Sequence, residues 1–240
     1  MSCVSKKNIV YFQNDNINQS EVSNSYKTIF KPDDLLQITV TAIDLEAVKA
    51  FNLPAVNYAT ATNNAIGTPQ QQSYLVDNDG YIDFPVIGKI KIAGLTREEA
   101  IQLLRNKLDP DYVKSPTINI RISNFKVTVL GDVQSPGTFT IPNERITILE
   151  AIGLARDLNI TGVRKDVYVI REIDNKKIEF KVDLLSKELF TSPIYYLQQN
   201  DMVYIQPNRS SSQDAAYNRN TGLFVSIGSI IVSLIAVLTR

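Results

Sequence analysis

The stretch VDNDGYIDFPVIGKIKIAGLTREEA, residues 76–100, combines strand and helix signals in one short segment. Apolar and polar residues alternate in YIDF and again in KIKI, which is the pattern of strands with one buried face. Asp79-Gly80 is typical of a hairpin turn. Thr96 followed by Glu99 forms a capping box, which predicts a helix from about Thr96 to Leu108. The segment therefore predicts a mixed fold of strands and helices.

The rest of the chain repeats this mixture on both sides. Leu36, Ile38 and Val40 alternate with polar residues and predict a strand near the N-terminal end. After Pro116 the pattern predicts a strand, a hairpin turning at 135–137, a helix opened by a capping box at 147–150, a hairpin turning at 174–177, a short helix and a last strand that stops at 207. The expected fold class is α+β.

Two segments lack any such period. Residues 52–76 carry no charge and are rich in Asn, Thr, Ala, Gln and Pro, which predicts a long surface loop. Ser5 to Ser25 is rich in Asn, Ser and Gln and holds few large aliphatic residues. Such a segment buries too little apolar area to offset chain entropy, so we expect it to be extended or mobile.

Composition limits the classes of protein that the chain can represent. Its 240 residues are 44% hydrophobic, which is enough for one large or two small cores. Lys and Arg together number 25, as do Asp and Glu, so there is no basic excess for a nucleic-acid partner. We expect a globular protein that does not bind nucleic acid.

Most hydrolytic chemistry is excluded by the absence of histidine and the presence of a single cysteine. The chain has one cysteine and no histidine, so it forms no internal disulfide, no Cys/His zinc site and no His-based nucleophile triad. We find no carboxylate pair in a recognisable catalytic setting. The expectation is a protein with no catalytic residues and no cofactor.

The acidic run Asp77-Asn78-Asp79-Gly80 is similar to part of a calcium-binding EF-hand loop. Aligning Gly80 with the loop glycine places Leu75 at the first ligand position and Val86 where the bidentate Glu belongs. Neither side chain ligates calcium. We therefore interpret the run as a turn and expect no metal site.

Cys3 lies near the N-terminus with only Met1 and Ser2 before it. Bacterial lipoproteins are cleaved just before a cysteine that follows small residues, although no charged region and apolar core precede this one. The residues alone leave two readings, which are a free thiol on a disordered end and a lipidated residue on a polar tether.

The C-terminal stretch GLFVSIGSIIVSLIAVL, residues 222–238, carries no charge. As an α-helix, its 17 residues would span about 26 Å, close to the roughly 30 Å of a bilayer's hydrocarbon core. One stripe of this helix holds the small residues Gly222, Ser226, Ser229, Ser233 and Ala236. The other side holds Phe224, Ile227, Ile231, Leu234 and Leu238.

Three arrangements fit this predicted membrane helix. A lone anchor requires only apolarity, whereas packed helices use small residues to approach closely. A ring of helices around water would place the small polar side inward and the large aliphatic side toward lipid. Serine hydroxyls can also bond to their own helix backbone, so the stripe alone does not select among the three.

Five motifs, in this order, carry a family resemblance. They are FKPDDLLQITV, VDNDGYIDFPVIGKIKIAGLTREEA, VTVLGDVQSPGTFTIP, ITILEAIGLA and NDMVYIQP. The series covers about Tyr26 to Pro207 and resembles the outer-membrane polysaccharide export family. Asp79-Gly80, Pro85, Gly88 and Gly94-Leu95 match its export domain, while Gly131, Pro136-Gly137 and Asn200-Asp201 match a soluble-ligand-binding β-grasp domain, known as an SLBB domain.

The chain departs from the family pattern at two turns. Pro32-Asp33-Asp34 stands where the family has Pro-Gly-Asp. Ala155-Arg156-Asp157 stands where it usually has Ala-Gly-Gly, which leaves the shape of that loop open. Only one β-grasp copy is visible, whereas longer members carry two or more.

The resemblance implies five parts. They are a lipidated N-terminal tether at 1–25, a polysaccharide export domain at 26–123, an SLBB β-grasp domain at 124–208, a linker at 209–221 and a C-terminal membrane helix at 222–239. It further implies lipidation of Cys3, a ring of commonly eight subunits, and an inner-membrane co-polymerase or tyrosine autokinase as partner. The helix would contribute to an α-helical barrel through the outer membrane, with its small-residue stripe facing the lumen or a helix seam.

The expected function is therefore a subunit of an oligomeric channel that exports capsular or exopolysaccharide. Its place would be the outer membrane, lipid-anchored, with the soluble part in the periplasm. The alternative is a monomeric periplasmic or surface glycan-binding lipoprotein. A carboxylate-dependent glycan-modifying enzyme is a third reading, and an inner-membrane anchor is the rival for the tail.

Overall fold

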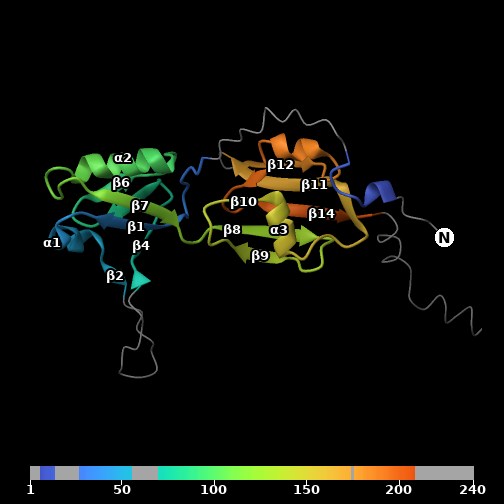
Figure 1. The fold of residues 1–240 in the computed structure, drawn as a ribbon. Helices are drawn as coiled ribbons and strands as arrows, with labels where there is room; N and C mark the ends of the chain where they lie inside the picture. The colour runs from blue at the N-terminus through green and yellow to red at the C-terminus, as the bar shows by residue number, and fades with distance from the viewer. Residues whose placement is uncertain (1–5, 14–26, 56–69, 174–175, 209–240) are drawn as a thin grey trace, which may run out of the picture.

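The computed structural model describes residues 6–13, 27–55, 70–173 and 176–208, and it divides them into two lobes (Figure 1). Each lobe has its own hydrophobic cluster. The first lobe comprises the described residues between 27 and 123, and the second comprises the described residues between 124 and 208 together with residues 7–13, here called the N-terminal arm. Both lobes mix strands with helices, so the α+β class is confirmed.

The first lobe is built on a short sheet with a helix beside it. Its helical elements are α1 (Leu45–Val48), η2 (Lys49–Phe51) and α2 (Arg97–Leu108). Its strands are β1 (Leu35–Thr41), β2 (Pro54–Ala55), β3 (Gln70–Gln71), β4 (Ser73–Leu75), β5 (Tyr81–Phe84), β6 (Gly88–Lys91) and β7 (Thr117–Ile122).

Strand β1 is the centre of this lobe, paired antiparallel with β4 on one side and β7 on the other. Its alternating residues Leu36, Ile38 and Val40 are fully buried, as their spacing predicts. The predicted helix is confirmed as α2, which begins after a complete capping box between Thr96 and Glu99. The helix buries Ala100, Leu104 and Leu108 against the same core.

Asp79-Gly80 forms a turn, as predicted, but this turn does not join the two strands of a hairpin. The hairpin is formed at the next turn along the chain. The backbone N–H of Gly80 donates to the carbonyl of Asp77, and the Asp77 carboxylate accepts from the N–H of Tyr81, which supports the turn reading of this acidic run. Among the described strands, β4 before the turn pairs with β1, while β5 after it pairs with β6. The hairpin therefore turns at residues 85–87, where Val86 has a φ of 67°.

The predicted loop at 52–76 is wrong at its two ends. Residues 54–55 and 70–71 pair as β2 and β3, and residues 73–75 form β4. The side-chain amide of Gln71 donates to the carbonyl of Ile38, and Tyr74 is buried. These contacts come from distant residues, so local composition could not indicate them. Residues 56–69 lie outside the described part of the chain.

The second lobe contains a five-stranded sheet with helical elements around it. Its helical elements are η1 (Lys6–Asn8), α3 (Ile148–Leu154) and η3 (Lys187–Thr191). Its strands are β8 (Lys126–Gly131), β9 (Gly137–Thr140), β10 (Ile146–Thr147), β11 (Gly162–Ile173), β12 (Lys176–Val182), β13 (Tyr196–Leu197) and β14 (Met202–Pro207).

The strand order of the large sheet is β12-β11-β14-β8-β9. The two predicted hairpins are confirmed, since β8 pairs antiparallel with β9 and β11 with β12. The first and last strands of this sheet in the chain, β8 and β14, lie parallel at its centre. Helix α3 begins with the predicted capping box between Thr147 and Glu150 and packs Ile148, Ala151 and Ile152 into the core.

The N-terminal arm packs against the second lobe, so the expected extended or mobile segment from Ser5 to Ser25 is wrong for residues 7–13. The backbone N–H groups of Phe12 and Gln13 donate to the carbonyls of Leu184 and Leu185. The rings of Phe12 and Phe190 lie 5.1 Å apart between centroids. Packing between these two aromatic rings thus helps to hold the arm on the second lobe, although the surrounding segment is polar.

Two turns that depart from the family pattern keep a backbone that favours glycine. Asp33 has a φ of 69°, and Arg156 and Asp157 have φ values of 62° and 71°. A side chain in this left-handed region costs about 1 kcal/mol or more compared with glycine. The sequence left the shape of the loop at 155–157 open, and in the structure both Arg156 and Asp157 adopt the left-handed backbone conformation.

Replacing Arg156 with glycine is expected to raise the free energy of unfolding by about 1 kcal/mol, because the strain at this exposed position is relieved. Denaturant titration followed by circular dichroism measures the change. Arg105→Gly is the matched control, since Arg105 lies inside α2, where glycine costs about 1 kcal/mol. A loss of stability in Arg156→Gly would contradict the assignment of strain.

Among the described residues, no helix is long and apolar enough to cross a membrane. The C-terminal stretch at 222–239 lies outside them, as do the linker and Cys3. The predicted membrane helix and the predicted lipidation stay predictions.

Candidate functional site at the junction of the lobes

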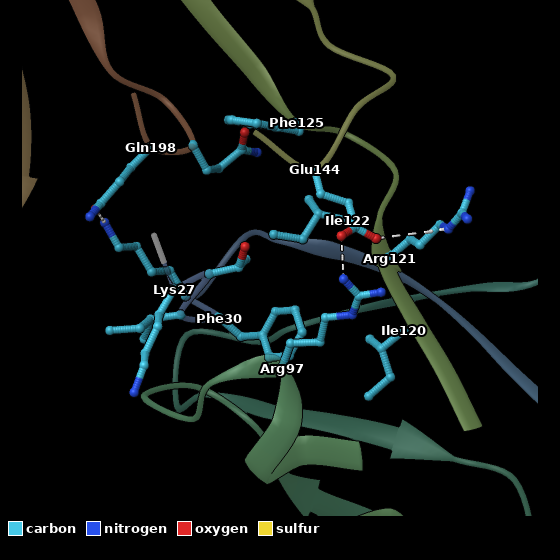
Figure 2. A pocket seen from close by; sticks show the side chains of 13 residues that line it. Lys27, Phe30, Arg97, Ile120, Arg121, Ile122, Phe125, Glu144 and Gln198 are labelled. Atoms are coloured by element: carbon cyan, nitrogen blue, oxygen red, sulfur yellow. Dashed lines mark hydrogen bonds and ion pairs between the residues drawn. The ribbon is translucent and has the colours of Figure 1, made fainter. Parts of the chain in front are cut away.

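An open pocket lies between the two lobes, with about 540 Å³ of empty space that includes open solvent (Figure 2). Its apolar walls are Phe30, Ile120, Ile122 and Phe125. The first lobe contributes the segment 27–31, the start of α2 and the end of β7. The second lobe contributes Phe125, Glu144 and the side chains at 198–199. The pocket therefore exists only because the lobes are placed together.

Neutral side chains bond the lobes next to this pocket. Asn124 bridges toward the first lobe, accepting from the N–H of Leu35 and donating to the carbonyl of Asp33, both at 2.9 Å. The side chain of Gln199 in turn donates to the carbonyl of Asn124 at 3.0 Å and accepts from the N–H of Lys126 at 2.8 Å. This chain of bonds fixes the crossing from β7 to β8.

Charged side chains also connect the lobes. Glu144 of the second lobe pairs with Arg97 at the start of α2, and its carboxylate lies 4.0 Å from the Nε of Arg121 (Figure 2). Lys31 donates to the side-chain oxygen of Gln198 at 2.9 Å, and burial lowers the pKa of this ammonium. Charged and polar interactions thus join the two lobes around the pocket.

The turn before β1 holds a buried carboxyl at this junction. One oxygen of Asp34 accepts from the backbone N–H of Lys31 at 2.8 Å, while the other is buried and without a hydrogen-bond partner. Burial raises the pKa of Asp34 to about 6, against the lowering effects of the Lys31 N–H and the Lys31 charge. Its ionised form therefore carries a desolvation cost.

This raised pKa makes stability depend on pH. A carboxyl whose pKa is higher in the folded than in the unfolded chain contributes stability at acid pH, and loses that contribution as pH rises through about 4 to 6. The difference in unfolding free energy between the native chain and Asp34→Asn should fall by about 2–3 kcal/mol from pH 3.5 to 7. Urea titrations at several pH values measure it, and Asp44→Asn on the exposed N-cap of α1 is the control. A difference that is constant with pH would contradict the raised pKa.

The side chains at the junction hold the two lobes together. The pocket is lined by lysine, arginine and glutamine side chains and one carboxylate, with no thiol or hydroxyl nucleophile held by a base. Within the described part of the chain, no group of three or more His, Cys, Asp or Glu could hold a metal ion.

A second group of contacts lies at the end of the second lobe that faces away from the first, here called the distal end (Figure 1). The hydroxyl of Tyr11 in the arm donates to the Asp157 carboxylate at 2.5 Å, and the Arg164 guanidinium lies over the Tyr11 ring, 5.5 Å from its centroid. Burial, and then Asp157, raise the pKa of Tyr11. The arm is therefore bonded by its side chains as well as by its backbone.

The last described residue leaves the lobe at the same end. The N–H of Asn208 donates to the carbonyl of Thr161 at 2.8 Å, three residues before Arg164. The chain toward Cys3 and the chain toward the C-terminal stretch thus both depart from the distal end.

Each site residue predicted from the sequence lies outside the described residues, in the N-terminal five or in 209–240. Their assignments therefore stay predictions. Conversely, the sequence did not indicate the junction pocket or the arm contacts. The run Ile9-Val10-Tyr11-Phe12, in a segment otherwise rich in Asn, Ser and Gln, was the available signal for the arm.

Comparison with known families agrees with the division into lobes. Residues 22–123 match the family described as polysaccharide biosynthesis/export protein, and residues 125–205 match the SLBB domain. Together the two matches account for both lobes apart from the arm. The first is a family of export proteins and not a family of enzymes.

Two curated relatives are similar to this chain, and both are named EPS I polysaccharide export outer membrane protein EpsA. The protein of Ralstonia solanacearum is 28% identical over 152 residues, which cover 62% of this chain and 40% of the relative. The protein of Ralstonia nicotianae is 33% identical over 98 residues, which cover 40% of this chain and 26% of the relative. The chain thus spans less than half the length of either relative.

Proposed function

Since this chain belongs to the polysaccharide export family, we propose that it is a subunit of the outer-membrane apparatus that carries an extracellular polysaccharide out of the bacterial cell. The observation that carries the proposal is the order of two domains, export and then SLBB, across residues 22–205. The proposed cargo, an extracellular polysaccharide, and the proposed location, the outer membrane, are taken from the names of the two relatives. The chain would act as a conduit, with no bond made or broken in the polymer.

The positions of the N-terminal arm and of Asn208, the last described residue, support an orientation for this subunit. The N-terminal arm and Asn208 both lie at the distal end of the second lobe, while α1 lies at the opposite end of the first lobe (Figure 1). If Cys3 is lipidated and 222–239 crosses the outer membrane, both attachments lie on one side. The second lobe would then stand next to the outer membrane, and the first lobe would extend into the periplasm.

Within this proposal the subunits form a ring, and an inner-membrane co-polymerase or tyrosine autokinase meets it from the periplasmic side. The small-residue stripe Gly222, Ser226, Ser229, Ser233 and Ala236 would face the lumen or the neighbouring helix. The large residues Phe224, Ile227, Ile231, Leu234 and Leu238 would face lipid. A stable monomer would instead favour the monomeric glycan-binding lipoprotein.

Deleting the gene from the native host is expected to stop the appearance of polysaccharide outside the cell, and the full-length gene should restore it. Extracellular and cell-retained polymer are measured separately, because an export defect retains polymer whereas a synthesis defect removes it. Mass measurement of the detergent-solubilised chain then separates a ring of several subunits from a monomer. Normal extracellular polymer in the deletion strain would refute the proposal.

Replacing both Ser229 and Ser233 with leucine is expected to impair assembly or export while the two described lobes keep their fold, because bulk then fills the proposed seam. The matched control replaces Ile227 and Ile231 with leucine, which preserves apolarity on the opposite side. The oligomer in detergent and the extracellular polymer are the readouts. An unchanged oligomer with unchanged export would refute the assignment of the stripe.

A further inference from the structure

We propose that the distal end of the second lobe is a lipid-contacting surface, made by Val10, Leu154 and Ile160 with the basic residues Lys7 and Arg156. That this lipid belongs to the outer membrane follows from the proposed function, on which this inference rests. It adds that the folded second lobe itself touches the bilayer, beyond any attachment through the chain ends.

Large apolar side chains are exposed within a few residues of these contacts: Val10 precedes Tyr11, Ile160 precedes Thr161, and Leu154 lies three residues before Asp157. Ile160 is 61% exposed, Leu154 is 47% exposed and Val10 is 43% exposed. They come from three separate places, which are the loop before β11, the end of α3 and the N-terminal arm. Exposed apolar side chains that gather at one end of a lobe are typical of an interaction surface.

The loops that present these side chains are held by hydrogen bonds. Next to Ile160, the Asn159 amide donates to the Asp132 carboxylate at 2.7 Å. Beside Leu154, the carbonyl of Ala155 accepts from the N–H of Ser135 at 2.9 Å, and the carbonyl of Asp157 accepts from Gln134 at 3.0 Å. The apolar side chains are therefore displayed by an ordered frame.

The charges at this end favour a phospholipid surface. Lys7 and Arg156 are exposed, and basic side chains beside apolar ones are typical of segments that lie in the headgroup region. Two carboxylates lie nearby: Asp157 accepts from the Tyr11 hydroxyl, and one oxygen of Asp132 accepts from the Asn159 amide while its other oxygen is buried without a hydrogen-bond partner.

The sequence on either side of this surface favours lipid as the occupant. Cys3 lies four residues before Lys7, a reach of about 14 Å when extended, so a lipid on that residue would hold the arm close to a bilayer. Asn208 departs next to Ile160, through its bond to Thr161, toward the uncharged stretch at 222–238. Both continuations lead from the same surface to the chain's most lipid-compatible features.

The test places a photo-crosslinking amino acid at position 160 of the full chain in its native host, with position 43 as the matched control. Ile43 is an isoleucine that is 101% exposed and lies beside α1, at the far end of the first lobe. After illumination, mass spectrometry separates adducts with phospholipid from adducts with protein. We expect about tenfold more phospholipid adduct at position 160 than at position 43, as for a side chain in the headgroup region.

A second variant tests the surface without changing the probe. With the crosslinker at position 10, Ile160→Asp together with Leu154→Asp should reduce the phospholipid adduct several-fold, while Ile43→Asp should not. Equal lipid adducts at positions 160 and 43, or adducts at 160 that join only protein, including a second copy of this chain, would overturn the proposal. Export measured in the same cells tests the proposed function separately from the lipid-contacting surface. Normal export without a lipid adduct would refute the lipid-contacting surface and leave the proposed function standing. Lipid adducts in a host whose export does not need the chain would refute the proposed function alone.

Discussion

Replacing Gly131 with alanine is expected to destabilise the second lobe by about 4 kcal/mol, a large share of the roughly 5–15 kcal/mol by which native proteins are stable. Gly131 ends β8, has a φ of 95° and faces Ile205 in the parallel partner strand β14. A Cβ built at this position overlaps the carbonyl oxygen of Ile205. That carbonyl oxygen accepts a hydrogen bond from the backbone N–H of Asp132. It therefore cannot move away without weakening the pairing of β8 with β14.

The matched control for this substitution is Gly88→Ala. Gly88 has a similar φ of 79°, but a Cβ there meets nothing within 4 Å. Only the backbone strain of about 1 kcal/mol should then be lost. Denaturant titration by circular dichroism gives the stabilities, and limited proteolysis with peptide mapping shows which lobe opens. If Gly131→Ala were as mild as Gly88→Ala, the close approach of β8 and β14 would be wrong.

The elements that sequence predicted well are those specified by neighbours in the chain. Thr96 with Glu99 and Thr147 with Glu150 mark the starts of α2 and α3, because a capping box satisfies the first free N–H groups of a helix. The hairpins β8–β9 and β11–β12 likewise follow from alternation around a turn. In these cases the physical cause lies within a few residues.

Features that join distant residues were missed for the opposite reason. Nothing around Gln71 indicates that its amide will bond to Ile38, and nothing around Tyr11 indicates Asp157 as its partner. The polar composition near the arm favours an unpacked chain, and the tertiary contacts of two aromatic rings override it. The junction pocket could not be predicted because it requires both lobes in place.

A buried ion pair stabilises the second lobe beside the junction. Arg171 donates through Nε to both carboxylate oxygens of Asp201, at 3.0 and 3.1 Å, and through Nη2 to one of them at 2.6 Å. The Arg171 side chain is 7% exposed and that of Asp201 is 1% exposed. The same carboxylate accepts from the N–H of Gln198, whose side chain accepts from Lys31 of the first lobe. The pair therefore orders the turn that meets the first lobe.

Arg171→Met is expected to cost about 3–5 kcal/mol, because the Asp201 charge stays buried after its main partner is removed. Arg171→Met combined with Asp201→Asn should be less destabilised than Arg171→Met alone, since no unpaired charge is then left in the core. The control is Lys181→Met in the half-exposed Lys181–Asp166 pair, where solvent screening should leave stability nearly unchanged. Denaturant titrations of the three variants and the native chain give the comparison. If the double variant were no more stable than Arg171→Met, the loss would come from the packing of the arginine side chain over Phe180 and not from the stranded charge.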